Sequence, residues 1–186
     1  MRFCLFLLFV FLLPVSSAQA LSFVEAPSTA HTLVDPARIP LSYAFKRVHG
    51  KGTHVLYFFS DPDCPFCVKV EKLLETIDDL TVYTFLLPIP NIHPLSEEKA
   101  KKLWCAENRE AAWKAFFDTN TLPDNDGSCE TPIDGIYKFA ASLGIRYPAL
   151  IFSDGTIVEG PRFIVDTINK ERLEALIKLY SVEKER

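Results

Sequence analysis

The chain has 186 residues, of which 48% are hydrophobic and 24% charged, and its formal net charge is −4 at pH 7. This length fits one globular domain with a small appendage and excludes a large multidomain enzyme. The apolar content excludes wholesale disorder, and the excess of acidic residues gives no electrostatic basis for binding nucleic acid or an anionic membrane surface.

The first twenty residues have the pattern of a secretory signal peptide. Arg2 precedes an almost unbroken apolar run at 3–15, and the small-residue pattern Ala-Gln-Ala follows at 18–20. The run is shorter than the ~20 residues that a membrane-spanning helix needs, so a retained anchor is the less favoured alternative. We therefore predict that residues 1–20 are a signal peptide and are removed on export.

Five cysteines are present in the full chain, and removal of the signal peptide leaves four. These four are Cys64, Cys67, Cys105 and Cys129. In an exported protein, an even number of cysteines points first to disulfide chemistry and only second to metal binding.

The first half of the exported chain is predicted to form a βαβ unit after an exposed lead-in segment at 21–40. Residues 41–49 are expected to form a short helix. Dense β-branched and aromatic runs at 54–59 and 81–87 predict two buried strands, and apolar residues at helical spacing predict a helix over 64–78 between them. Strand, helix and strand in this order indicate parallel pairing.

Two helices are predicted in the middle of the chain. Ser96 is expected to cap a long helix that extends to about Phe117, with acidic residues in its first turn. A second helix is expected over 132–143, after a polar turn. Together they form a helical insertion over about 92–144.

A hairpin and a helix are predicted at the C-terminal end. The expected strands at 149–153 and 156–159 are joined by an Asp-Gly pair, which is typical of a tight hairpin turn. An apolar stripe predicts the last helix over 168–180, and a charged tail follows at 183–186. Without the middle helices, the order of elements over 41–182 is that of a minimal thioredoxin fold.

The Cys64-Pro65-Phe66-Cys67 segment is the strongest candidate for chemistry. It follows a buried strand and begins a helix, where unpaired amide groups and the helix dipole stabilise a thiolate. We expect Cys64 to be exposed and acidic and Cys67 to be shielded one helical turn further on, as thiol–disulfide exchange requires. Less favoured alternatives are a static disulfide and a zinc site that uses all four cysteines.

Three polar residues near this segment each have two interpretations. Asp61 and Asp63 are expected to form the turn and cap the helix, although their charge would oppose a Cys64 thiolate. His93, in the loop after the second buried strand, is interpreted first as a surface histidine. The alternative is that His93 tunes the reactivity of Cys64.

A proline stands directly before the third predicted strand, where it removes a backbone hydrogen-bond donor. A cis Tyr147-Pro148 bond would leave the preceding backbone free to pair with an extended peptide. A trans proline that begins an edge strand is an equal alternative on this pattern alone.

Several segments resemble the DsbC/DsbG family, the periplasmic disulfide isomerases of Gram-negative bacteria, over about residues 41–180. They are 59–67 (FSDPDCPFC), 103–106 (LWCA), Cys129, 147–149 (YPA) and 154–156 (DGT). The resemblance implies an α/β class, thioredoxin-like fold with an inserted helical segment between the βαβ unit and the C-terminal ββα unit.

The resemblance also implies roles for individual residues. Cys64 is the nucleophile and Cys67 its partner, and the Tyr147-Pro148 bond is cis and lies beside this pair. The implied substrate-binding residues are Pro65, Phe66, Tyr147 and Pro148. The implied structural disulfide joins Cys105 and Cys129.

The implied function is that of a periplasmic thiol–disulfide oxidoreductase or disulfide isomerase that acts on protein disulfides. It needs no dissociable cofactor and no metal, because the cysteine pair is the redox group. A membrane thiol reductase of the DsbD type is the implied electron partner, and no nucleic acid is involved. Metal delivery by the thiol pair is a less favoured function, since Met1 is the only methionine.

Two departures from the family matter. Tyr147 stands where the best-known members have threonine. About 33 residues separate the predicted cleavage site from the first strand, fewer than the ~40 at which a domain usually folds unaided, so the family's N-terminal dimerisation domain is expected to be missing. A monomer is therefore expected. The alternative function is a monomeric thiol reductase, or a redox-assisted chaperone or assembly factor for a secretion or conjugation system.

Overall fold

A computed structural model describes residues 30–31, 33–160 and 168–181 of the chain. The predicted signal peptide and its cleavage site lie outside these residues. So do the predicted charged tail at 183–186 and the first part of the lead-in segment. The boundaries predicted for these segments therefore stay predictions. The expectation of an exposed lead-in is wrong for its described part, because Ala30 and His31 pair with another strand of the sheet and Val34 and Ile39 are buried.

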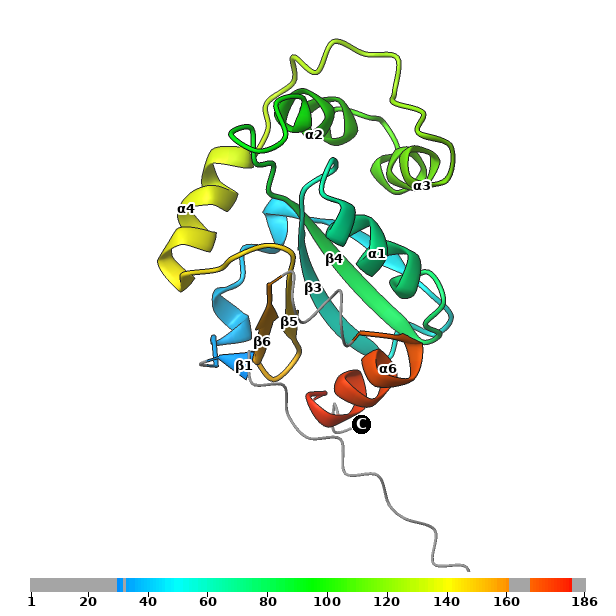
Figure 1. Ribbon diagram of the computed structural model, residues 1–186, viewed down its shortest axis with the longest axis vertical. Coiled ribbons are helices and arrows are strands. Elements are labelled where there is room, and N and C mark those ends of the chain that lie inside the picture. The colour runs from blue at the N-terminus through cyan, green and yellow to red at the C-terminus, as the bar shows by residue number, and fades with distance from the viewer. Residues whose placement is uncertain (1–29, 32, 161–167, 182–186) are drawn as a thin grey trace, which may run out of the picture.

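In the described residues, a six-stranded mixed sheet forms the centre of the molecule, with strand order β1-β6-β5-β3-β4-β2 (Figure 1). The strands are β1 (Ala30–His31), β2 (Phe45–Val48), β3 (His54–Ser60), β4 (Leu80–Leu86), β5 (Ala149–Phe152) and β6 (Ile157–Glu159). β3 and β4 pair in parallel, and the other neighbouring strands pair antiparallel. The parallel pair confirms the predicted βαβ unit.

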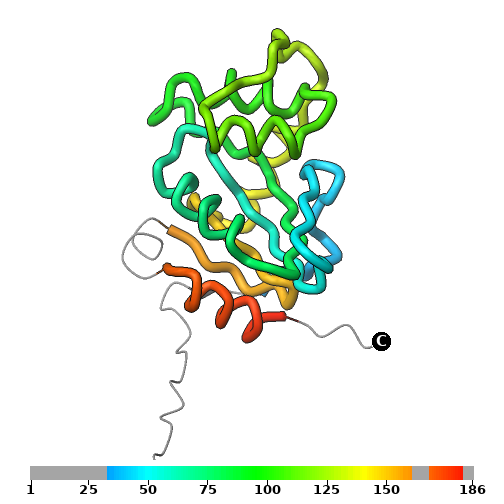
Figure 2. The backbone as a smooth tube through the Cα atoms, turned by 90° about the vertical axis from the view of Figure 1, so that its right-hand side faces the viewer, coloured from blue at the N-terminus to red at the C-terminus, as the bar shows by residue number. Residues whose placement is uncertain are grey.

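Helices cover both faces of the sheet and one of its ends. They are α1 (Pro65–Leu74), α2 (Ser96–Trp104), α3 (Arg109–Thr119), α4 (Ile133–Leu143) and α6 (Lys170–Leu179). α1 and α6 lie on one face and α4 lies on the other (Figures 1 and 2). α2 and α3 lie beyond the end of the sheet at which β3 leads into α1.

Alternating side chains of β3 explain why both faces are covered. Leu56 and Phe58 belong to a core shared with α1 and α6, whereas Tyr57 and Phe59 belong to a second core shared with α4. Phe59 also stacks on Phe85 of β4, with 4.5 Å between the ring centroids. A strand that is buried on both faces has the near-continuous apolar sequence from which β3 was predicted.

The predicted short helix at 41–49 is wrong. A 3₁₀ turn at Leu41–Tyr43 leads instead into the edge strand β2, which pairs with β4. Strand alternation turns Phe45 and Arg47 inward. The Arg47 side chain is 2% exposed and forms an ion pair with Glu71 of α1, so the edge strand carries a buried charge that an apolar pattern does not reveal.

The single long helix predicted from Ser96 to Phe117 is in fact two helices, α2 and α3. Asn108 separates them because its side-chain oxygen accepts a hydrogen bond from a backbone amide in the first turn of α3 (3.0 Å) and caps that helix. Ser96 is the first residue of α2 rather than its cap, and its hydroxyl accepts a hydrogen bond from Ile89 N (3.0 Å). The remaining predicted strands and helices are confirmed, with ends shifted by a few residues.

Candidate active site

Cys64 connects the end of β3 to the start of α1. Its extended backbone (φ −77°, ψ 119°) makes it the N-cap residue of the helix, and Pro65 follows at the first helical position. The Cys64 carbonyl accepts the first helical hydrogen bond from Val68 N (3.0 Å). Cys64 therefore lies at a helix N-terminus, where the helix dipole and unpaired amides favour a thiolate over a thiol.

Both cysteines of the pair are free thiols and both are buried, with exposed fractions of 4% for Cys64 and 0% for Cys67. The expectation of an exposed Cys64 is therefore wrong, although Cys67 is the more deeply buried of the two. Pro65 is exposed and Phe66 is half-buried against the core. Pro65 is thus the most exposed residue of the motif.

The two thiols have opposite pKa shifts. A hydrogen bond from the Cys67 thiol, with further hydrogen bonds from the backbone amides of Cys67 and Phe66, lowers the pKa of Cys64 to about 6, against burial and the charge of Asp61. Burial, and then the hydrogen bond and charge of Cys64, raise the pKa of Cys67 above its usual range. At neutral pH this arrangement holds a thiolate at Cys64 and a thiol at Cys67.

The Tyr147–Pro148 peptide bond is cis and directly precedes β5. Because Ala149 of β5 pairs with Phe59 of β3, Pro148 lies at the end of β3 that leads to Cys64. Pro148 is buried and Tyr147 is half-buried. The structure therefore brings this segment, distant in sequence, to the same end of the sheet as the cysteine pair.

Asp61 is a fully buried carboxylate in the turn before Cys64. One carboxylate oxygen accepts a hydrogen bond from Asp63 N (2.7 Å) and the other from Ile89 N (2.6 Å), while Asp61 N donates to the Cys67 sulfur (3.4 Å). Asp61 forms the turn, as the sequence predicts, but neither it nor Asp63 caps α1, because the N-cap residue is Cys64. Asp63 instead pairs with Lys99 of α2.

His93 is not a plain surface histidine. Its Nδ1 lies 3.0 Å from Asp61 Oδ2, and 18% of its side chain is exposed. Backbone hydrogen bonds from His93 N to Ile89 O (2.8 Å) and from Ser96 N to His93 O (2.9 Å) fold the loop that holds it there. The second sequence-based interpretation placed His93 near Cys64, but the contact with Asp61 was not predicted, since the two residues lie 32 positions apart.

An open groove of about 470 Å³ lies beside the start of α1. One side is formed by Pro62, Asp63 and Val68, and the other by residues 116–120 at the C-terminal end of α3. Its apolar lining comes from Pro62, Val68, Phe116 and Phe117. This groove was not predicted, because it requires α3 to pack next to a turn far away in the sequence.

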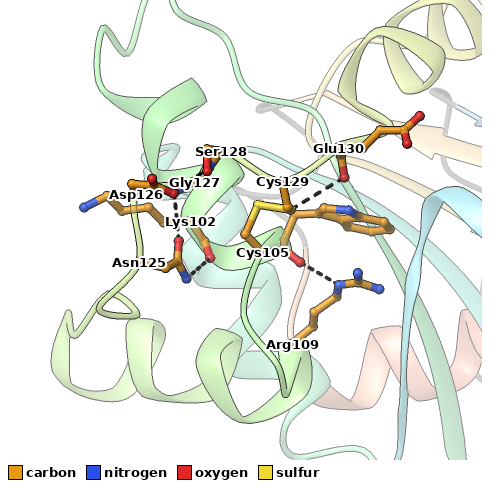
Figure 3. Close-up of a disulfide and its surroundings, with 10 residues drawn as sticks. Lys102, Cys105, Arg109, Asn125, Asp126, Gly127, Ser128, Cys129 and Glu130 are labelled. Atoms are coloured by element: carbon orange, nitrogen blue, oxygen red, sulfur yellow. Dashed lines mark hydrogen bonds between the residues drawn. A yellow bond between two sulfur atoms is a disulfide. The ribbon is translucent and has the colours of Figure 1, made fainter.

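A disulfide joins Cys105, at the end of α2, to Cys129, 24 positions later (Figure 3). Two further contacts secure the same end of α2. Asn125 donates to the Lys102 carbonyl (3.3 Å), and Arg109 donates to the Trp104 carbonyl (2.6 Å). They satisfy two of the helix-terminal carbonyls that lack a partner within α2.

Within the described ranges, no group of three or more His, Cys, Asp or Glu side chains is arranged to hold a metal ion. In the same part of the chain, none of the helices is long and apolar enough to cross a membrane.

Comparison with known proteins identifies the family. The thioredoxin-like domain family matches residues 41–179, and the chain belongs to this family. A protein named as a probable thiol:disulfide interchange protein DsbC, from Bordetella pertussis, is 36% identical over 123 residues, which cover 66% of this chain and 43% of the relative. The thiol:disulfide interchange protein DsbC of Salmonella typhimurium is 29% identical over 111 residues, which cover 58% and 46%.

Among solved structures, a disulfide interchange protein from Neisseria gonorrhoeae is 32% identical, with a TM-score of 0.69, and the match covers 78% of this chain and 99% of that chain. These matches confirm the predicted α/β thioredoxin-like fold and the resemblance to disulfide interchange proteins of the DsbC type. The chain spans less than half the length of the curated relatives it matches.

Proposed function

We propose that this thioredoxin-like protein is a thiol–disulfide oxidoreductase, of the disulfide isomerase or reductase type, that acts on protein disulfides. The observation that carries the proposal is the opposite shift of two neighbouring thiols. The pKa of Cys64 is lowered to about 6, whereas the pKa of Cys67 is raised. A thiolate is thus available for attack at neutral pH, and a second thiol is held in reserve beside it.

Exchange takes place in two displacement steps. The Cys64 thiolate attacks one sulfur of the substrate disulfide, a mixed disulfide forms, and the other substrate sulfur leaves as a thiolate. Cys67 then loses its proton and attacks the Cys64 sulfur, which forms the Cys64–Cys67 disulfide and releases the second substrate thiolate. The substrate gains two electrons and the cysteine pair loses two. In isomerisation, a substrate thiolate displaces Cys64 instead, and there is no net electron transfer.

We assign substrate contacts to the surface around Cys64. The contacting residues are Pro65, Phe66, Tyr147 and Pro148. Support comes from the exposure of Pro65 and from the position of the cis Tyr147–Pro148 bond at the same end of the sheet. The groove beside α1 offers room for a side chain that flanks the substrate cysteine.

The proposal includes a cellular setting. The predicted signal peptide supports a periplasmic location, and a membrane thiol reductase of the DsbD type would keep the pair reduced. No dissociable cofactor is required, because the two cysteines are themselves the redox group. The predicted monomer is checked by mass measurement with light scattering.

A second candidate function is that of a redox-assisted chaperone or assembly factor. It is favoured by Ile92 and Leu95, which are 67% and 59% exposed on the loop that carries His93. Because His93 contacts Asp61, this loop lies near the cysteine pair. Exposed apolar side chains at such a place suit binding of an unfolded polypeptide.

Replacement of each cysteine tests the proposed function. The purified Cys64→Ala chain is expected to lose reduction of insulin disulfides, because it has no attacking thiolate. The Cys67→Ala chain is expected to accumulate mixed disulfides with the substrate, which are seen by non-reducing electrophoresis. The matched control replaces the other pair, Cys105→Ala with Cys129→Ala, and is expected to retain exchange activity when folded.

Retained reduction by the Cys64→Ala chain would contradict the proposal. Failure of the Cys67→Ala chain to trap mixed disulfides would show that the assigned roles are wrong. The double variant Cys64→Ala with Cys67→Ala separates the second candidate. If it still prevents aggregation of an unfolded, cysteine-free client, binding without exchange is the better description.

A further inference from the structure

The Asp61 carboxylate places a buried negative charge next to the thiolate that the proposed function requires. Asp61 N contacts the Cys67 sulfur, and Asp61 O accepts a hydrogen bond from Cys64 N (3.2 Å). Two like charges in a low-dielectric interior destabilise each other. The Asp61 charge accordingly raises the pKa of Cys64, in opposition to the hydrogen bonds that lower it.

His93 is placed to offset that charge. Its Nδ1 donates to Asp61 Oδ2 over 3.0 Å, and the imidazole carries a positive charge once the second ring nitrogen is protonated. The 18% of the side chain that remains exposed lets solvent supply this proton.

We propose that His93 is a positioning residue for thiol–disulfide exchange, which binds the buried Asp61 carboxylate, offsets its charge and so stabilises the Cys64 thiolate. This inference rests on the proposed role of Cys64 as the nucleophile. His93 acts through Asp61 and contacts no reacting atom. Stabilising the thiolate favours the reduced pair over its disulfide, so the Asp61–His93 pair also sets the reduction potential of the site.

The other charged and titratable groups around this pair do not replace His93. Lys99 of α2 bonds to Asp63, and no lysine or arginine in the described ranges forms an ion pair with Asp61. Tyr137 of α4 donates to Pro88 O, and its pKa is raised to about 12 by burial and by nearby acidic groups. These acidic and phenolic groups are Glu97, Tyr147, Asp61 and Asp134. Glu97 and Asp134 are carboxylates and the tyrosines are neutral phenols, so none of them supplies a cation that could replace His93.

The test is the pH profile of Cys64 in the reduced full-length exported chain, measured by thiolate ultraviolet absorbance and by the rate of alkylation. His93→Gln retains an N–H donor for Asp61 but has no charge. The pKa of Cys64 is expected to rise by up to about one unit, so the rate of alkylation at pH 6 should fall by about threefold to fivefold. Above pH 8 the rate should match that of the wild type, because Cys64 is then a thiolate in both chains. The equilibrium with glutathione is expected to shift toward the Cys64–Cys67 disulfide.

Two further variants separate charge from structure. His93→Lys keeps a positive charge, and it is expected to retain the low pKa of Cys64. His54→Gln makes the same substitution at the start of β3, about 20 Å from the cysteine pair, and is expected to leave the profile unchanged. Asp61→Asn removes the charge to be offset, so adding His93→Gln to it should have little further effect.

Three results would overturn the inference. The first is a His93→Gln profile that coincides with the wild type, even if that variant is less stable. The second is an equal shift from His54→Gln. The third is a rise in the Cys64 pKa that His93→Gln causes equally in the Asp61→Asn chain and in the wild type. If the Asp61→Asn chain does not fold, a raised pKa of Cys64 in His93→Lys takes the place of this result. Because the pH profiles need no substrate, they remain decisive even if disulfide exchange by the wild type were absent.

Discussion

At the scale of single residues, Cys64 and Cys67 lie one helical turn apart and have opposite pKa shifts. Cys64 is the N-cap residue of α1. Its pKa is lowered chiefly by the neighbouring Cys67 thiol and also by two backbone amides. Cys67 lies inside the helix, fully buried, and donates to the anion beside it. The acidity of Cys64 therefore depends chiefly on its partner, since the hydrogen bond from Cys67 is the largest cause of the lowered pKa.

Substitution of Cys67 tests this dependence. Cys67→Ala removes the thiol donor, so the pKa of Cys64 is expected to rise by one unit or more, on the order of 1.4 kcal/mol per unit. Cys67→Ser is the matched control, because its hydroxyl still donates and should keep most of the lowered pKa. Both are measured by the pH dependence of alkylation. Equal profiles for the two variants would show that the helix N-terminus, and not the thiol, stabilises the anion.

At the scale of elements, the α2–α3 insertion is stabilised largely by its connections. α2 has Glu97 and Glu98 in its first turn and lysines in its last, which suits the helix dipole. Its C-terminal end is secured by the Cys105–Cys129 disulfide and by the hydrogen bonds from Asn125 and Arg109. The insertion in turn forms one wall of the groove beside the cysteine pair.

Loss of this disulfide is expected to destabilise the protein without affecting the chemistry of Cys64. The bridge closes a segment with a sequence separation of 24, so Cys105→Ala with Cys129→Ala should lower the free energy of unfolding by roughly 3 kcal/mol in the chain-entropy model. Urea denaturation at neutral pH measures this change. A loss below about 1 kcal/mol would mean that the packing of α2 and α3 alone stabilises the insertion.

At the scale of the whole molecule, the site is assembled where several distant segments meet at one end of the sheet. The β3–α1 turn supplies the cysteines and Asp61, the loop before α2 supplies His93, and the segment before β5 supplies the cis proline.

A buried ion pair between Arg47 and Glu71 links the edge strand β2 to α1. Burial outweighs this pairing and raises the pKa of Glu71.

The lowered pKa of Cys64 makes the stability of the reduced chain depend on pH. The folded pKa is about 6 and the ordinary value is 9, so the stabilising contribution is present above pH 9 and is lost as the pH falls toward 6. The difference in unfolding free energy between wild type and Cys64→Ala, both fully reduced, should grow by up to about 4 kcal/mol from pH 6 to pH 9. Denaturant titrations across this range measure it. A difference that does not vary with pH would contradict the lowered pKa.

The sequence by itself determined the βαβ unit, the C-terminal hairpin and helix, and the position of the cysteine motif. Local patterns are sufficient for these features, because β3 and β4 are buried on both faces and Cys64 directly follows a strand at a helix start. Local patterns failed where a distant partner decides the outcome. The segment at 41–49 becomes strand β2 because it pairs with β4 and buries Arg47 against Glu71.

Only the tertiary structure decided the electrostatics of the site. Three features of the site depend on residues that are far apart in the chain. They are the burial of Cys64, the contact between His93 and Asp61, and the groove beside α1. The physical reason is that burial and charge interactions depend on distance in space, which the spacing of residues along the sequence does not encode. The sequence therefore predicted which residues take part, and the fold determined how their charges balance.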